Sequence, residues 1–114
     1  MPHTVHVVFS RRPESVPEDE YNAWYGRHIA EILALPGFAA ATRYALVPAL
    51  DEPAEPDNFT HAAIYEIEGN VADAMAALDA EVASGRMNLP DWFGQIRFSS
   101  WQAAPLGPLV SAQA

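Results

Sequence analysis

The sequence has 114 residues, of which half are hydrophobic and 18% are charged, so it is long enough to fold as one domain around a hydrophobic core. The net charge is −9, and with only 6 basic residues we expect no binding to nucleic acid or to an anionic membrane surface. There are no cysteines, which excludes disulfides, thiolate metal sites and a cysteine nucleophile, and which fits a cytoplasmic protein. The first apolar run extends only from Val5 to Phe9, so we expect neither a signal peptide nor a membrane span.

The N-terminal half predicts a strand, a helix and a second strand. Residues 4–9 are rich in β-branched side chains, which is typical of a strand. Ser15 and Glu18 have the spacing of a capping box, so we expect a helix to begin at Ser15 and to end at Pro36-Gly37. Residues 38–47 have apolar side chains at both sets of alternating positions, which predicts a second strand covered on both faces.

The predicted first helix carries an apolar stripe that contains one histidine. Positions three and four residues apart share a helix face, and here they are Tyr21, Trp24, Tyr25, His28, Ile32 and Leu35. A single histidine on such a face is usually a core residue with one good hydrogen bond. The alternative is a titratable group at the floor of a pocket, because imidazole changes charge near neutral pH. Glu31 could orient His28 or could simply be solvated.

The C-terminal half predicts a loop, a strand, a helix and a last strand. Residues 48–58 hold three prolines and four acidic residues, which predicts a solvated loop without a metal site. Residues 60–68 predict the third strand, and Asn70 and Gly85 are expected to cap the two ends of the second helix. The last strand is expected over 92–102. One domain would then span 1–114, with a core of 4–103 and a C-terminal tail of 104–114.

This βαββαβ order indicates an α+β domain with a ferredoxin-like fold, a four-stranded antiparallel sheet with both helices on one face. The other face would be bare in a monomer although it carries apolar residues, with Val8 and the alanines of 38–47 as examples. A sheet must bury such a face against another layer. The simplest partner is a second copy packed sheet against sheet, so we expect a homodimer with two-fold symmetry.

The stretch from Val7 to Leu46 resembles the EthD-like branch of the dimeric α+β barrel superfamily. Its pattern is a helix of the form N-x-W-Y-x-x-x-H, then L-x-x-P-G-F, then a strand ending in R-Y or R-F. The matching positions are Asn22, Trp24, Tyr25, His28, Leu33, Pro36, Gly37, Phe38, Arg43 and Tyr44. Residues 65–87 are also similar to uncharacterised bacterial members of this branch. Members often have proline two residues after the histidine, where this chain has Ala30, so the helix is expected to continue more regularly.

The resemblance implies a pocket between the first helix and the sheet in each subunit of a dimer. Related barrels include cofactor-free polyketide cyclases, anthrone oxygenases and decarboxylases, muconolactone isomerases and haem-degrading monooxygenases. Methylmuconolactone isomerase is similar in placing a histidine on this helix. By that likeness, His28 would shuttle a proton at a carbon next to a carbonyl or phenol.

The leading functional hypothesis is a cofactor-free lyase, isomerase or cyclase. It would perform proton-transfer chemistry on a small aromatic, polyketide-like or lactone substrate. His28 would be the general acid or base, since its pKa can lie near the working pH. Tyr21, Trp24 and Tyr25 would form the pocket floor, although such an aromatic cluster is more often core.

Four strand residues are further candidates, because the sequence leaves open which strand face turns inward. Arg43 or Arg97 could hold a carboxylate or an enolate oxygen. Tyr44 or Tyr65 could donate a hydrogen bond to a phenolate. An ordinary ion pair is at least as good an explanation for each arginine.

Two alternatives stay open. The first is a non-catalytic dimer that binds a small apolar ligand or serves as a structural module; a hole beside His28 favours the enzyme, and full packing favours structure. The second is haem binding, with His3, His6, His28 or His61 as axial ligand. No phosphate-binding loop is present and no two histidines have i, i+4 spacing, so no cofactor and no metal are expected.

Overall fold

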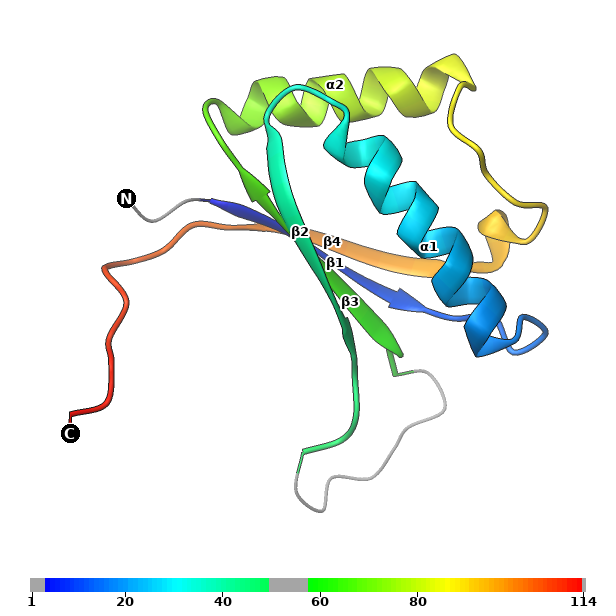
Figure 1. Ribbon diagram of the computed structural model, residues 1–114, viewed down its shortest axis with the longest axis horizontal. Helices are drawn as coiled ribbons and strands as arrows, with labels where there is room; N and C mark the ends of the chain where they lie inside the picture. Colours follow the sequence, from blue (N-terminus) through cyan, green and yellow to red (C-terminus); the bar gives the residue numbers. More distant parts are fainter. Residues whose placement is uncertain (1–3, 50–57, 114) are drawn as a thin grey trace.

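The computed structural model describes residues 4–49 and 58–113, which form an α+β fold with a four-stranded antiparallel sheet and two α-helices (Figure 1). The elements in chain order are β1 (Val5–Arg11), α1 (Glu18–Leu33), β2 (Phe38–Ala45), β3 (His61–Ile67), α2 (Val71–Ser84), the 3₁₀ turn η1 (Phe93–Gln95) and β4 (Arg97–Ala103). In space the strands lie in the order β2-β3-β1-β4. Among these residues no helix has the length and apolar character needed to cross a lipid bilayer.

The burial pattern along β1 separates the two faces of the sheet. His6, Val8 and Ser10 are buried, whereas the residues between them are only half-buried. Val8 belongs to the hydrophobic core that both helices share, and both helices lie on the same side of the sheet in Figure 1. The expectation that Val8 lies on the bare face was therefore wrong. The more apolar set of alternating positions in β1 contains Val5, Val7 and Phe9 and faces away from the helices. Hydrophobicity along β1 therefore did not identify the inward side.

Helix α1 begins at Glu18 rather than at Ser15. Pro17 is the N-cap residue with φ −59°, and no side chain caps the helix. Ser15 instead lies in a turn closed by a hydrogen bond of 3.0 Å from Val16 N to Pro13 O. The predicted capping box was therefore wrong, because this turn removes the Ser15 side chain from the helix start.

Five of the six residues of the predicted stripe are buried in α1, namely Tyr21, Trp24, Tyr25, His28 and Ile32. The helix ends at Leu33 rather than at Pro36-Gly37, so the sixth residue, Leu35, follows the helix and is half-buried. The helix continues without a break through Ala30 to Leu33. Gly37 then turns the chain into β2 with φ +92°, a conformation that favours glycine. A β-carbon at Gly37 would lie 2.9 Å from Cβ of Ala74, so the turn packs closely against the start of α2.

Both predicted caps of α2 are confirmed. The Asn70 side chain accepts a hydrogen bond of 3.0 Å from Asp73 N, and Gly85 ends the helix in the left-handed conformation with φ 75°.

Strand β4 begins at Arg97, so the expectation that it begins at Trp92 was wrong. The preceding residues form η1, which starts with a hydrogen bond of 2.9 Å from Phe93 N to Pro90 O. Trp92 and Phe93 pack edge-on against Trp24 of α1, with ring centroids 5.3 and 5.7 Å from it. These aromatic residues therefore close one end of the space under the helices instead of extending the sheet.

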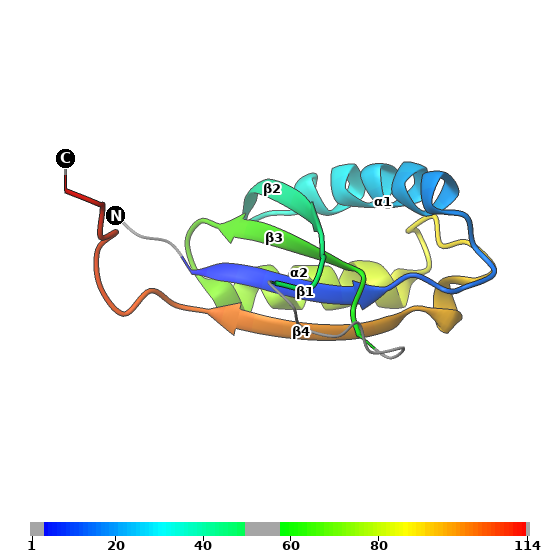
Figure 2. The ribbon, with the colours of Figure 1, turned by 90° about the horizontal axis from the view of Figure 1, so that it is seen from below.

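The face of the sheet that points away from the helices is apolar and is uncovered in the single chain. In Figure 2 the strands lie in front and α2 lies behind them. Val7 and Ile64 line a depression on this face, together with Tyr44, which is 49% exposed. Trp101 of β4 is 62% exposed. Residues 38–47 are thus covered on one face only within one chain, as expected for a single subunit whose second face is covered by another copy.

Candidate functional site

A cavity of about 310 Å³ lies between the two helices and the sheet. It is lined by His6, Val8, Tyr25, His28, Ile32, Tyr65, Leu78, Asp79, Val82, Ala83, Leu89, Phe93, Phe98 and Ser100. At one side of this lining, Asp79, Val82, Ala83 and Leu89 are exposed and form the mouth, whereas the histidines and tyrosines are buried. A mainly apolar cavity with a few inward polar groups is typical of small-molecule sites.

His28 lies in the buried part of this cavity and is 8% exposed. Its imidazole stacks on the indole of Trp24, with centroids 4.8 Å apart, and meets Tyr25 edge-on at 5.6 Å. Its Nδ1 is buried and has no hydrogen-bond partner among the described residues. Burial lowers the pKa of His28, and the charge of Glu31 opposes this in part. At neutral pH the ring is therefore neutral, with one unprotonated nitrogen.

Glu31 has a different role from the two that the sequence suggested. Its Oε2 accepts a hydrogen bond of 3.0 Å from Asn88 N, while Trp24 Nε1 donates one of 3.0 Å to Asn88 O. Two side chains of α1 therefore fix the backbone of Asn88 next to Leu89, which lines the cavity. Glu31 acts on His28 through its charge and positions the edge of the cavity.

His6 is a cavity residue that the sequence suggested only as a haem ligand. It is 8% exposed, and its Nδ1 is buried without a hydrogen-bond partner in the described part of the chain. Burial lowers the pKa of His6, with a smaller opposing effect from the backbone of Trp101. The alternation of His6 with Val8 along β1 would have indicated this position once the inward face was known.

Tyr25 and Tyr65 place two phenols in the same cavity. Tyr65 lies directly opposite His6 in the β1–β3 register, with ring centroids 5.8 Å apart. Burial raises the pKa of both tyrosines well above the ordinary value of 10.0. Both phenols therefore keep their protons across the physiological pH range and are able to donate hydrogen bonds.

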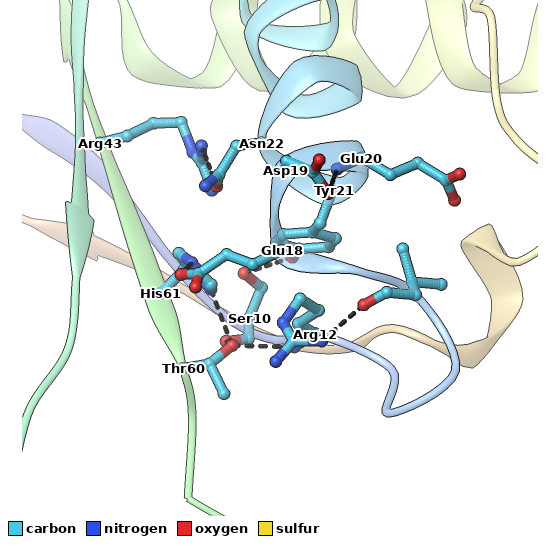
Figure 3. Close-up of polar contacts among 11 residues, drawn as sticks. Ser10, Arg12, Glu18, Asp19, Glu20, Tyr21, Asn22, Arg43, Thr60 and His61 are labelled. Carbon is cyan, nitrogen blue, oxygen red and sulfur yellow. Dashed lines mark hydrogen bonds and ion pairs between the residues drawn. The ribbon is translucent and has the colours of Figure 1, made fainter.

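Tyr21 and Arg43 lie outside this cavity, in a polar cluster at the N-terminal end of α1 (Figure 3). The Tyr21 hydroxyl donates a hydrogen bond of 2.8 Å to Ser10 Oγ. Arg43 Nη1 donates one of 2.9 Å to Asn22 Oδ1, and the guanidinium lies 4.4 Å from the centroid of the Tyr25 ring. Tyr25 thus contacts both the cluster and the cavity.

The structure brings three of the candidate residues together and separates the others. His28, Tyr25 and Tyr65 line the cavity, and Trp24 supports His28 without lining it. Tyr44 is on the outer face of the sheet and is 49% exposed. Arg97 is exposed, with its guanidinium 4.6 Å from the centroid of the Phe59 ring.

The histidines divide between two places. His6 and His28 share the cavity, whereas His61 lies in the polar cluster, where its Nε2 is 3.4 Å from Glu18 Oε1. The predicted ligand candidate His3 lies outside the described residues. Within 4–49 and 58–113 no three histidine, aspartate or glutamate side chains are close enough together to hold a metal ion.

The geometry of the cavity is the main source of information on function. No model of a known protein family matches the sequence, and no curated protein is significantly similar to it.

Proposed function

We propose that the chain is a cofactor-independent enzyme of the lyase, isomerase or cyclase type, which moves a proton on a small aromatic, polyketide-like or lactone substrate. One observation carries this proposal: His28 and His6 line the same cavity, and the Nδ1 atom of each is buried without a hydrogen-bond partner among the described residues. A purely structural core histidine would normally satisfy that nitrogen, because leaving it unpaired costs free energy. The cavity volume of about 310 Å³ is at the lower end for small-molecule sites, which suits a one- or two-ring substrate.

In this proposal His28 is the general base. Its lowered pKa keeps it neutral at neutral pH, so it accepts a proton from the carbon next to the substrate carbonyl. The electron pair of that C–H bond moves onto the carbonyl oxygen and gives an enolate. Tyr25 and Tyr65 remain protonated because burial raises their pKa values, and they donate hydrogen bonds to this oxygen.

Return of the proton to another carbon of the enolate completes an isomerisation. Protonated His28, which lines the cavity, supplies it and returns to its neutral form. The substrate gains and loses one proton, so no other reactant is required.

Under the same proposal, the chain belongs to the EthD-like branch and forms a ferredoxin-like dimeric barrel. The motif around His28 supports the family, and the strand order β2-β3-β1-β4 with two helices supports the architecture. The uncovered apolar face of the sheet supports the dimer, because a second copy of the same face would bury it. The cytoplasm remains the expected compartment.

The alternative is a small-ligand-binding module without catalysis. One observation favours it: Arg43 and Tyr44, two of the candidate catalytic groups, do not line the cavity. The cavity would then bind an apolar molecule, and the histidines would only hydrogen-bond to it.

The test uses α-angelica lactone, a small lactone whose double bond moves into conjugation when one proton leaves and another returns. We expect the protein to accelerate this isomerisation, and His28→Ala and His28→Asn to reduce the rate by about 10²–10⁴-fold, the usual contribution of a general acid or base. The matched control is Arg27→Ala, the exposed neighbour on α1, which should leave the rate unchanged. Circular dichroism and melting temperature would establish that each variant is folded.

Full activity in folded His28→Ala would contradict the catalytic role. Saturable binding of the lactone without any isomerisation, lost in a variant that fills the cavity such as Ala83→Leu, would favour the ligand-binding module.

A further inference from the structure

The polar cluster at the start of α1 contains nitrogen donors that lack partners. Arg43 uses Nη1 to bind Asn22, but its Nε and Nη2 are buried and have no hydrogen-bond partner among the described residues. His61 is 4% exposed, and its Nδ1 lies 2.8 Å from Thr60 Oγ1. In the tautomer in which Nδ1 accepts from this hydroxyl, Nε2 carries the ring proton. The other ring nitrogen, Nε2, is buried with only the Glu18 carboxylate near it, at 3.4 Å and without hydrogen-bond geometry. Such unpaired buried donors are costly unless a ligand satisfies them.

Arg43 and His61 lie next to each other in the sheet. In the β2–β3 register Arg43 pairs with Ala63 and Ala45 pairs with His61, so Arg43 and His61 are diagonal neighbours on the helix side of the sheet. They line a hollow of about 180 Å³ together with Glu18, Asn22, Tyr44 and Ala45. Figure 3 shows Arg43 beside Asn22 of α1, and His61 beside Glu18.

Aromatic packing fixes the orientation of the guanidinium. Its central carbon lies 4.4 Å from the centroid of Tyr25 and 5.8 Å from that of Tyr21. A guanidinium held against ring faces keeps its N–H groups at its planar edge, where they match the two oxygens of a carboxylate. Arg43 is therefore preorganised as a fork, whereas a lysine at this position would be a flexible point charge.

The Glu18 carboxylate does not fill this role in the observed arrangement. Its side chain is 60% exposed and its nearest partner is His61. Its negative charge at the edge of the hollow also disfavours a doubly charged ligand such as phosphate. A singly charged carboxylate is smaller and planar, and a hollow of about 180 Å³ holds it with a few further atoms.

We propose that Arg43 and His61 form a second site, separate from the His28 cavity, that binds the carboxylate of a small organic acid. Arg43 donates hydrogen bonds from Nε and Nη2 to the two carboxylate oxygens, and His61 donates one from Nε2 to one of them. The site shares only Tyr25 with the cavity, through the ring face that Arg43 covers. It does not depend on the reaction assigned to His28.

The test is a titration with sodium acetate at constant ionic strength, with sodium chloride as the reference salt. The side-chain N–H signals of Arg43 and His61 are followed by NMR in the full-length protein; the Arg43 Nε–H signal is the one that Arg43→Lys removes. We expect a saturable shift in the millimolar range with acetate. Two variants should each weaken acetate binding at least tenfold. In Arg43→Lys the binding is measured from the His61 signal, and in His61→Gln it is measured from the Arg43 signal. Arg86→Lys, which changes the exposed arginine paired with Glu81, is the matched control and should leave binding unchanged.

A shift with acetate no larger than that with chloride would overturn the proposal, as would wild-type affinity in folded His61→Gln. Tighter binding of phosphate than of acetate would overturn the assignment of a carboxylate. The readout is binding alone, so a failure of the lactone reaction leaves this result unaffected.

Discussion

The indole of Trp24 lies nearly parallel to the imidazole of His28, with the ring centroids 4.8 Å apart and the planes at 19°. The same indole donates its Nε1–H to Asn88 O at 3.0 Å. One side chain thus fixes both the histidine inside the cavity and the backbone at the edge of the cavity. The stack also explains why Trp24 is buried although it does not line the cavity.

Trp24→Phe should destabilise the fold through the lost hydrogen bond. The phenyl ring still stacks on His28, but the part-buried Asn88 carbonyl loses its donor, which costs about 1–3 kcal/mol of the free energy of unfolding. Urea denaturation measures this loss. Glu31→Gln is the matched control, because an amide oxygen is still able to accept from Asn88 N, and it should lose much less. Equal losses in the two variants would contradict this account of Trp24.

Stability should fall as the pH is lowered from neutral. Burial lowers the pKa values of His6, His28 and His61 below 6.5, their ordinary value in the unfolded chain. The unfolded state therefore binds more protons than the folded state in the window just below pH 6.5. The stabilisation is complete above that value and is lost as the pH falls toward the folded-state pKa values.

Urea denaturation at about pH 7.5 and about pH 5.5 tests this sign. His28→Gln, which does not titrate, should show a flatter dependence than the unchanged protein. A free energy of unfolding that is constant or higher at the lower pH would contradict the lowered pKa values.

The elements that the sequence predicted well are those set by local interactions. The buried stripe of α1 follows from helical periodicity, and Asn70 and Gly85 cap α2 through contacts within a few residues. The start of β4 was predicted wrongly because its cause is tertiary. Trp92 and Phe93 have side chains typical of strands, but here they pack against Trp24, far away in the sequence.

In the candidate site, too, residues placed by local structure were predictable from the sequence, and residues placed by tertiary structure were not. His28 and Tyr25 were identifiable because a helix fixes which of its residues share a face. The strand residues were not, because β1 and β2 carry apolar residues on both faces. Only the sheet register places His6 next to Tyr65 inside the cavity and Tyr44 outside it. The direction of a strand face is a property of the assembled sheet, and hydrophobicity along one strand does not contain it.

Gly37→Ala should cost more stability than Gly69→Ala. Both glycines have positive φ, +92° and +82°, so an alanine at either one is strained by about 1–2 kcal/mol. At Gly37 the new β-carbon also meets Cβ of Ala74 at 2.9 Å, whereas nothing lies within 4 Å at Gly69. That contact should add about 1–3 kcal/mol, as in other overpacked cores. Thermal or urea denaturation of the two variants measures the difference, and equal losses would show that the turn at Gly37 is not closely packed.

Ile64→Glu should separate the proposed dimer into folded monomers. Ile64 lies at the middle of β3 on the outer face, directly opposite Val7 of β1 and Thr42 of β2. If this face packs against its own copy, the substitution buries a carboxylate in each subunit near the two-fold axis, and such unpaired charges are strongly unfavourable. Sedimentation at micromolar concentration should give twice the chain mass for the unchanged protein and the chain mass for Ile64→Glu. Ala30→Glu adds the same charge at an exposed position of α1 and should remain a dimer. An unchanged protein that sediments as a monomer, or an Ile64→Glu protein that stays dimeric, would show that the apolar face is not the interface.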